Sequence, residues 1–407
     1  MRLLVSCIPY DGGKSGISVY VREVVAALKD QGHELTLLVE PGVTEIPSHS
    51  RASSVSRTSS ASRDSRTSST SSASRNLSNL KNQSDSSLIS APRWTRRAVF
   101  SMLWHLFVLP FWIRRHRRDF DGFVICAANR RVCAWYPLPT AATVHDLANF
   151  HIPGKYSRLR MFYLAHILPF FAKRAQHLVA VSGATKTDMV KYWHCRESAV
   201  TVLYNGLQLG TQNQKPETRN YQLSTINYQL STILYISRIE HPGKNHVRLI
   251  EAYGRLPREL AEAHPLVIAG ADWKDADIVH AAAKASPNAD LIRFTGFVED
   301  IEALWREAGY YVFPSLFEGF GLSLVEAMSR GIPCACSNNG SLGEIAADVA
   351  ITFNPESVDE IAQALARLIA EPPAAREARI ARGREHARKF SWADHVAGLV
   401  KLLEGAA

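Results

Sequence analysis

Cysteine is scarce in this sequence and is not arranged for metal binding or for a disulfide framework. The 407 residues include six Cys, none in a CxxC pair and none with a His at the spacing of a zinc site. Scattered thiols of this kind are typical of buried side chains in a reducing compartment. The apolar run near the start, Leu3–Ile8, ends at Pro9 and is too short for a signal peptide. We therefore expect a cytoplasmic protein.

Acidic residues are nearly absent from one part of the chain. Residues 51–118 contain twelve Arg and one Lys but only two Asp, a net charge of +11, whereas the whole chain has a net charge of +9. The rest of the chain is therefore slightly acidic. This distribution is unlike that of a nucleic-acid-binding protein whose whole surface is basic, so we expect no nucleic-acid partner.

The first part of the basic stretch, Ser48–Ser90, has almost no aromatic or large aliphatic residues and consists mainly of Ser with Arg, Thr, Ala and Asn. Such a segment cannot bury enough apolar surface to offset the entropy lost on ordering. It is predicted to be a disordered insertion, and a phosphorylated or RNA-binding segment is the less favoured alternative.

The second part, residues 93–118, combines aromatic and basic residues. Its apolar stretch, Ala98–Ile113, has two Arg just before it and four soon after it. The stretch is shorter than the roughly 20 residues that span a bilayer, and His105 and Pro110 interrupt it. Two interpretations remain: a core helix under a loop, or a segment lying on an anionic membrane surface. The flanking charge and central aromatics favour the membrane surface.

Outside these segments, short apolar runs alternate with amphipathic helical patterns, and the alternation occurs twice. This pattern predicts two α/β domains with doubly wound parallel sheets, joined near the Asn205-Gly206 turn, with ligands between them at the carboxyl ends of the strands. A tandem heptapeptide, NYQLSTI at Asn220–Ile226 and Asn227–Ile233, is interpreted as a duplicated loop. The predicted strands are Leu3–Ile8, Glu34–Val39, Gly122–Cys126, Ala142–Val144, Leu178–Val181 and Val200–Leu203, then Ile233–Ser237, Leu266–Gly270, Leu291–Thr295, Tyr310–Pro314 and Ile332–Ser337.

The loop after the first strand contains Gly13 and Gly16. It is not a P-loop, because Ile8 stands where that motif requires Gly, and no GxGxxG motif indicates a nicotinamide cofactor. The loop is expected to direct the N–H groups of the following helix toward phosphate or sugar hydroxyls.

Two cations flank a Pro-Gly turn between a strand and a helix. Arg238 and Lys244 in this position suit a diphosphate whose charge they neutralise without a metal. Taken alone, an Arg and a Lys are more often solvated surface charges.

A glycine-rich turn carries two glutamates, Glu318 in a loop and Glu326 one turn inside the next helix. Carboxylates without a metal-ligand cluster are good acceptors for pairs of sugar hydroxyls, and the free N–H groups of Gly319–Leu322 are expected to point at an anion. A glycosidase pair is the alternative, but nothing in the sequence fixes the two acids across a sugar.

Together these features resemble the retaining GT-B glycosyltransferases of family 4, whose motif of two glutamates separated by seven residues matches Glu318 and Glu326. The resemblance covers nearly the whole chain apart from Ser48–Ser90 and the heptapeptides. It implies an N-terminal acceptor-side domain in residues 1–205, a nucleotide-sugar domain in residues 206–389, and a C-terminal helix in residues 390–407 that crosses back to the first domain.

The resemblance also implies roles. Arg238 and Lys244 would hold the donor diphosphate, Glu326 the ribose hydroxyls, and Glu318 with the turn of Gly319, Phe320, Gly321 and Leu322 the transferred sugar. His145, in the segment Thr143–Leu147, is similar to the family's histidine near the reacting sugar. One departure is Leu322-Ser323-Leu324, where the family commonly has a Pro.

The expected reaction is transfer of a hexose, mannose being the first candidate, from a nucleoside-diphosphate sugar to a hydroxyl acceptor, with no cofactor and no metal. The acceptor is a glycan, a lipid-linked saccharide or a polysaccharide, and the enzyme is expected to be peripheral at the inner membrane face. The alternatives are a sugar-nucleotide epimerase of the same fold, and a non-catalytic scaffold that binds sugar nucleotides or membranes.

Overall fold

The computed structural model describes residues 1–12, 15–47, 86–152, 154, 156–207 and 232–405. The predictions for Gly13, for residues 48–85 and for most of the repeated heptapeptide lie outside these residues.

The N-terminal domain contains a parallel seven-stranded sheet of order β3-β2-β1-β4-β5-β6-β7. Its central strands are buried on both faces, which explains their nearly continuous apolar sequences. The strands are β1 (Arg2–Ser6), β2 (Glu34–Val39), β3 (Ser87–Ser90), β4 (Gly122–Ile125), β5 (Thr140–Val144), β6 (His177–Ala180) and β7 (Val200–Val202). The helices are α1 (Gly16–Asp30), α2 (Ala98–Leu103), α3 (Leu109–Arg115), α4 (Arg158–Phe162), α5 (Leu168–Ala172) and α6 (Gly183–Trp193), with π-helical turns η3 (Trp104–Val108) and η5 (Tyr163–Ile167).

The C-terminal domain contains a parallel six-stranded sheet of order β10-β9-β8-β11-β12-β13. Its strands are β8 (Thr232–Ile236), β9 (Leu266–Ala269), β10 (Ile292–Phe294), β11 (Ala308–Phe313), β12 (Cys334–Ser337) and β13 (Ile351–Phe353). Its helices are α7 (His246–Tyr253), α8 (Arg258–Ala263), α9 (Ala276–Ala285), α10 (Ile301–Glu307), α11 (Leu322–Arg330), α12 (Ser341–Ala346), α13 (Val358–Ile369) and α14 (Pro373–Ala387).

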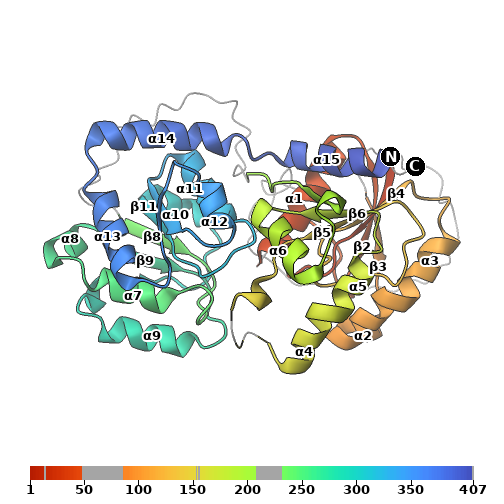
Figure 1. Ribbon diagram of the computed structural model, residues 1–407, viewed down its shortest axis with the longest axis horizontal. Coiled ribbons are helices and arrows are strands. Elements are labelled where there is room, and N and C mark those ends of the chain that lie inside the picture. The colour runs from red at the N-terminus through yellow and green to blue at the C-terminus, as the bar shows by residue number, and fades with distance from the viewer. Residues whose placement is uncertain (13–14, 48–85, 153, 155, 208–231, 406–407) are drawn as a thin grey trace, which may run out of the picture.

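The last helix, α15 (Trp392–Glu404), returns to the N-terminal domain and packs on α1 (Figure 1). The Tyr20 hydroxyl on α1 lies 2.8 Å from Nε2 of His395 on α15. Beside this crossing, the Leu207 N–H donates to the Phe390 carbonyl over 3.0 Å, so the end of the described N-terminal domain lies next to the start of the returning chain. The expected fold, two Rossmann-like domains with a helix crossing back, is confirmed.

The C-terminal end of the Ser-rich segment is ordered, and here the sequence prediction was wrong. Residues 87–90 form β3, which pairs in parallel with β2 from Thr36↔Ser87 to Val39↔Ser90. Only Leu88 and Ile89 distinguish these residues from the Ser-rich sequence before them. Backbone hydrogen bonds at the sheet edge, rather than burial of large side chains, hold this strand.

The basic and aromatic segment 93–118 is helical over α2, η3 and α3, and it combines features of both interpretations. Its inner face packs into the core of the domain, while aromatic side chains on its outer face are exposed. Within the described residues, no helix combines the length and the apolar character that crossing a bilayer requires. The core side chains are Trp104, Leu106, Leu109 and Ile113, and the exposed aromatic ones are Trp94, Phe100, Phe107 and Phe111.

Candidate functional site

The two domains touch where the loops after β5 and β11 meet. A Cβ atom on Gly319, after β11, would lie 1.8 Å from the carbonyl oxygen of His145, after β5. The Thr185 hydroxyl on α6 lies 3.2 Å from the His145 carbonyl oxygen and 3.3 Å from that of Gly319. Only glycine fits at 319, because any side chain would separate the two loops.

Lys244 and Glu318 form an ion pair beside this contact, with Nζ 2.6 Å from Oε1. Lys244 is further held by its backbone, whose carbonyl accepts the Tyr235 hydroxyl over 2.8 Å. Because both charged groups are mostly buried, an incoming diphosphate and sugar would meet an ammonium and a carboxylate already in position.

Arg238 also follows β8 but has different partners. Its guanidinium lies 3.4 Å from the Glu240 carboxylate and 5.2 Å from the centre of the Trp273 ring, and it stays substantially exposed. The structure therefore places the two cations at the same end of one strand without bringing them into contact.

The turn before α11 presents free backbone donors. Gly321 has φ = 106° and precedes the first helical residue, Leu322. Among the described residues, no acceptor receives a hydrogen bond from the N–H groups of residues 319–321. Leu322 starts the helix and adds a further N–H to this set. These donors lie beside Glu318 and suit oxygen atoms of a ligand.

Glu326 lies on α11 toward the N-terminal domain. Burial raises the pKa of its carboxyl group to about 7, and the charges of Glu23 and Arg22 on α1 also act on it, in opposite directions. No hydrogen bond from another described residue reaches its carboxylate. Gly16 begins α1, and the preceding Ser15 caps that helix by accepting the Ser18 N–H.

The His145 ring is fixed inside the N-terminal domain. Its Nε2 donates to the Cys126 carbonyl over 2.7 Å, and the ring meets that of Tyr20 edge to face at 4.6 Å. Burial lowers the pKa of this imidazole. The ring is therefore neutral at neutral pH, and its Nδ1 is a hydrogen-bond acceptor.

Glu344 joins the domains and was not identified from the sequence. Its carboxylate, on α12, accepts the N–H groups of Gly183 and Ala184 at the N-terminus of α6 over 2.8 and 2.9 Å, and the Tyr204 hydroxyl over 2.6 Å. A glutamate on a short helix normally indicates a solvated face, and its backbone partners lie about 160 residues away. No local signal could have revealed this contact.

All six cysteines are free thiols and are buried, as the sequence indicated. The described part of the chain contains no group of three or more His, Cys, Asp or Glu that could hold a metal ion.

Two facing Rossmann-like domains with a helix crossing back define the GT-B class of folds. Two family models match the sequence: "Glycosyltransferase Family 4" over residues 14–210 and "Glycosyl transferases group 1" over residues 220–386. The chain belongs to this family of group 1, family 4 glycosyltransferases.

Named relatives agree with this assignment. The chain is 30% identical over 254 residues to the O-antigen chain mannosyltransferase B of Escherichia coli, a match that spans 61% of this chain and 66% of that protein. Its fold is similar to that of sucrose-phosphate synthase from Thermosynechococcus elongatus, with a TM-score of 0.71, 15% identity and coverage of 100% and 99%. It is also similar to HepE from Anabaena, solved with UDP and glucose, with a TM-score of 0.67, 15% identity and full coverage of both chains.

Proposed function

We propose that this chain transfers a hexose, with mannose as the first candidate, from a nucleoside-diphosphate sugar to a hydroxyl acceptor, with retention of anomeric configuration. The pairing of Lys244 with Glu318 beside the free N–H groups of the α11 turn carries this proposal. The mannosyltransferase relative supports the choice of sugar, and the neighbour solved with UDP supports a nucleotide donor.

In this mechanism the donor diphosphate replaces Glu318 as the ion-pair partner of Lys244. Arg238 leaves Glu240 and binds the same diphosphate. Glu318 and the N–H groups of Gly319, Phe320 and Gly321 then hold the transferred sugar. The cations stabilise charge on the departing diphosphate, and closure of the domains excludes water.

The ionised Glu326 carboxylate accepts hydrogen bonds from the ribose hydroxyls of the donor. The N-terminus of α1, starting at Gly16, faces the same donor from the other domain. Attack occurs on the face that the diphosphate leaves, and a departing phosphate oxygen accepts the acceptor proton. Neutral His145 lines the sugar site, and no dedicated base is required.

The first test is a thermal-shift screen with GDP-mannose, UDP-glucose and ADP-glucose. A donor at 100 times its dissociation constant stabilises the protein by about 2.7 kcal/mol, and we expect GDP-mannose to give the largest shift. Transfer from that donor should persist in EDTA, and NMR of the product should show the donor's anomeric configuration.

Three results would contradict the proposal. They are the absence of a shift with any of the three donors, an inverted product, and an activity that EDTA removes and magnesium restores. An epimerised sugar nucleotide as the product would instead identify the epimerase alternative.

The proposed function includes attachment to an anionic membrane surface, through two helical segments of the N-terminal domain. These are α2-η3-α3 with its flanks, residues 93–118, and α4-η5-α5 with its flanks, residues 156–174. Of the sixteen large hydrophobic side chains exposed among the described residues, eleven lie in these two segments. They are Trp94, Val99, Phe100, Leu103, Phe107, Val108, Phe111, Leu159, Phe162, Ile167 and Phe170.

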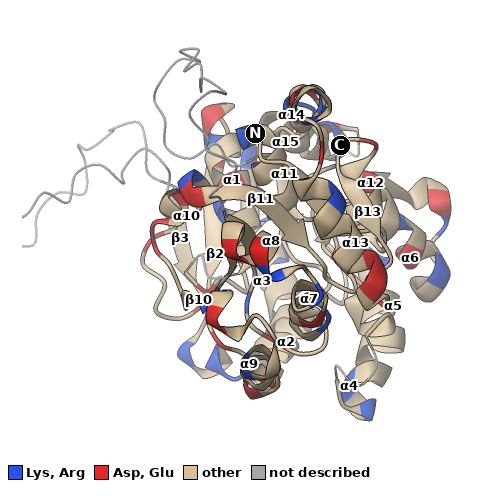
Figure 2. Ribbon diagram, turned by 90° about the vertical axis from the view of Figure 1, so that its left-hand side faces the viewer, with Lys and Arg blue, Asp and Glu red and all other residues tan. Residues whose placement is uncertain are grey.

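We call the exposed surface of these two segments, residues 93–118 and 156–174, the membrane face. Its charged residues are all basic. The two segments contain ten Arg and one Lys and no Asp or Glu. Figure 2 shows the basic residues of α4 where this helix projects from the lower side of the molecule. Aromatic side chains among cations suit an anionic lipid surface, to which each basic residue contributes about 1 kcal/mol.

The two segments share one loop and one core. The Ala134 N–H donates to the Leu106 carbonyl of η3 over 2.9 Å, and the Tyr136 hydroxyl donates to the Phe171 carbonyl of α5 over 3.2 Å. Pro110 has no N–H to bond the Leu106 carbonyl, which leaves it free for this loop. The inner faces of both segments pack into the same hydrophobic core.

Vesicle sedimentation tests the membrane face. The double variant Phe111→Ser/Phe170→Ser should partition at least about tenfold more weakly into vesicles containing phosphatidylglycerol, since each Phe loses about 1.5–3 kcal/mol of apolar burial. Phe297→Ser is the matched control, because Phe297 is 58% exposed in the other domain, compared with 65% for Phe111 and 54% for Phe170. Binding should fall with added salt. Equal partitioning of the double variant, or equal binding to neutral vesicles, would exclude this membrane face.

A further inference from the structure

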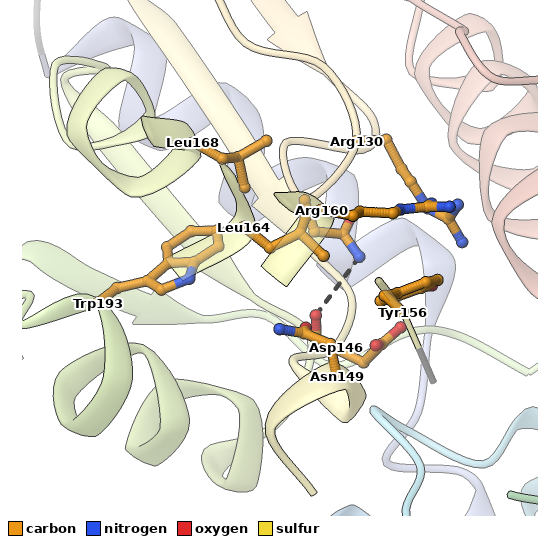
Figure 3. A pocket seen from close by; sticks show the side chains of 9 residues that line it. Arg130, Asp146, Asn149, Tyr156, Arg160, Leu164, Leu168 and Trp193 are labelled. Atoms are coloured by element: carbon orange, nitrogen blue, oxygen red, sulfur yellow. Dashed lines mark hydrogen bonds between the residues drawn. The ribbon is translucent and has the colours of Figure 1, made fainter. Parts of the chain in front are cut away.

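A pocket in the N-terminal domain lies next to the contact between the domains. Its walls come from the loop after β4, the loop after β5, the α4-η5-α5 segment and the end of α6. Asp146, which lines it, directly follows His145, whose carbonyl meets Gly319. Figure 3 shows Arg130, Arg160 and Tyr156 on one side of this pocket and Trp193 on the other. None of these side chains has a role in the donor site proposed above.

Two guanidinium groups of the pocket have no carboxylate partner. Among the described residues, no Asp or Glu oxygen lies within 4.0 Å of Arg130 or Arg160, and Arg160 instead lies 4.0 Å from the centre of the Tyr156 ring. Burial lowers the pKa of the neighbouring half-buried Arg131, the charges of Tyr163 and Glu40 act against this shift, and those of Arg130 and Arg160 add to it. Among the described residues that line the pocket, these two cations stand against one acid, Asp146, and a bound anion would neutralise the remaining positive charge.

A buried donor on the opposite wall also lacks a partner. Trp193 is 2% exposed, and its indole N–H has no hydrogen bond within the described part of the chain. The side-chain oxygen of Asn129, which also lines the pocket, is likewise buried without a donor. Buried polar groups are normally hydrogen-bonded. The indole N–H of Trp193 therefore suits an oxygen atom of a ligand as acceptor, and the side-chain oxygen of Asn129 suits a ligand hydroxyl as donor.

Asp146 is the one acid among the described residues that line the pocket, and its Oδ1 accepts the Ala148 N–H over 3.0 Å. It lies at the end nearest the proposed sugar site, where an acceptor hydroxyl must arrive. The two cations therefore exceed the acid charge of the pocket and suit a second, anionic part of the same molecule.

From this arrangement we infer that the pocket binds a phosphate group of the acceptor, held by Arg130 and Arg160, and that this phosphate belongs to a lipid-linked acceptor. The inference rests on the proposed function and specifies its substrate class. The helix α4 indicates that the phosphate belongs to a lipid. The same helix supplies Arg160 to the pocket and carries Leu159, which is 82% exposed, and Phe162 on the membrane face. A phosphate that lies between a membrane-facing helix and the sugar site has the position expected for the head group of a membrane lipid.

Calorimetric titration with geranyl diphosphate tests the inference, with excess GDP present so that the donor diphosphate site is filled. The double variant Arg130→Gln/Arg160→Gln should bind this probe at least about tenfold more weakly, because each lost charged hydrogen bond is worth more than a factor of ten. Arg158→Gln is the matched control, since Arg158 is exposed on the same helix but does not line the pocket. Thermal unfolding of all variants should show unchanged midpoints.

Inorganic pyrophosphate separates the two sources of a phosphate group. Tighter binding of geranyl diphosphate than of pyrophosphate supports a lipid-linked acceptor, and equal binding overturns the lipid part in favour of a soluble phosphorylated acceptor. Absence of geranyl diphosphate binding to the wild type, or equal weakening by Arg158→Gln, overturns the whole inference.

These outcomes are distinct from those of the donor screen. If no sugar nucleotide shifts the unfolding temperature while geranyl diphosphate binding depends on Arg130 and Arg160, the proposed function fails and the phosphate site stands. If a donor shifts the unfolding temperature while the double variant binds geranyl diphosphate normally, the reverse holds.

Discussion

Replacing Gly319 by alanine lowers the rate of sugar transfer by at least about 100-fold, because a 1 Å misplacement of reacting groups costs a factor of this size. The added methyl carbon would lie 1.8 Å from the His145 carbonyl oxygen, and an ordinary contact needs 3.4 Å or more. The obstacle is backbone, so no flexible side chain can move aside. The loop that carries Glu318 must then retreat from the N-terminal domain by more than 1 Å.

Gly383→Ala is the matched control for this variant. Gly383 lies inside α14, where an added methyl would make an ordinary contact with Met328 at 3.8 Å. Transfer by this control should equal that of the wild type, measured as product formed from the donor found in the thermal-shift screen. A Gly319→Ala protein with wild-type activity would show that the close approach of residues 145 and 319 is not needed for the reaction.

Glu326→Gln stabilises the protein at pH 8 by up to about 3 kcal/mol and leaves its stability unchanged near pH 4. The folded carboxyl has a pKa of about 7 and the unfolded one its ordinary value of 4.5. Between these values the folded state binds more protons, so this group makes the protein less stable as pH rises from 4.5 to 7. One pKa unit corresponds to about 1.4 kcal/mol, which gives the expected size.

Chemical unfolding curves at pH 4, 6 and 8 measure this effect. Glu299→Gln is the control, since Glu299 is exposed and its replacement should change stability little at any pH. Under the proposed function, the stabilised Glu326→Gln protein should also bind the sugar nucleotide more weakly, because a neutral amide replaces the carboxylate proposed to accept the ribose hydroxyls. A Glu326→Gln protein with the same pH dependence as the wild type would show that this carboxyl titrates normally.

The sequence predicted the regular part of the fold well because each signal was local. The strand Glu34–Val39 has the predicted bounds, and α6 begins after Ser182, a residue type that commonly caps helices. β3 was missed because Ser87 and Ser90 continue the composition of the preceding segment, and the pairing with β2 connects distant parts of the chain.

The residues of the candidate site could be predicted only where they stand together in one sequence motif. Glu318, the glycines after it and Glu326 stand in one short run, and the structure places them around one turn and the helix that follows. Lys244 and its partner Glu318 are 74 residues apart in the chain, and they meet only because β8 and β11 lie side by side. No local pattern distinguishes Arg130 and Arg160 from other basic residues, and only the fold brings both to one pocket.

The hydrogen bond from Leu207 to Phe390 affects how the two domains can move, because it joins the places where the chain leaves and re-enters the N-terminal domain. Since the described chain leaves and re-enters the N-terminal domain at this one place, we expect the two domains to rotate relative to each other about it as a hinge. Such a rotation must break the hydrogen bonds between Glu344 and the first N–H groups of α6. It must also separate the rings of His151 and Phe317, which are stacked with their centres 3.9 Å apart. We expect these contacts to set the energy of domain opening, and with it the rate at which the ligands of the proposed function enter and leave the site.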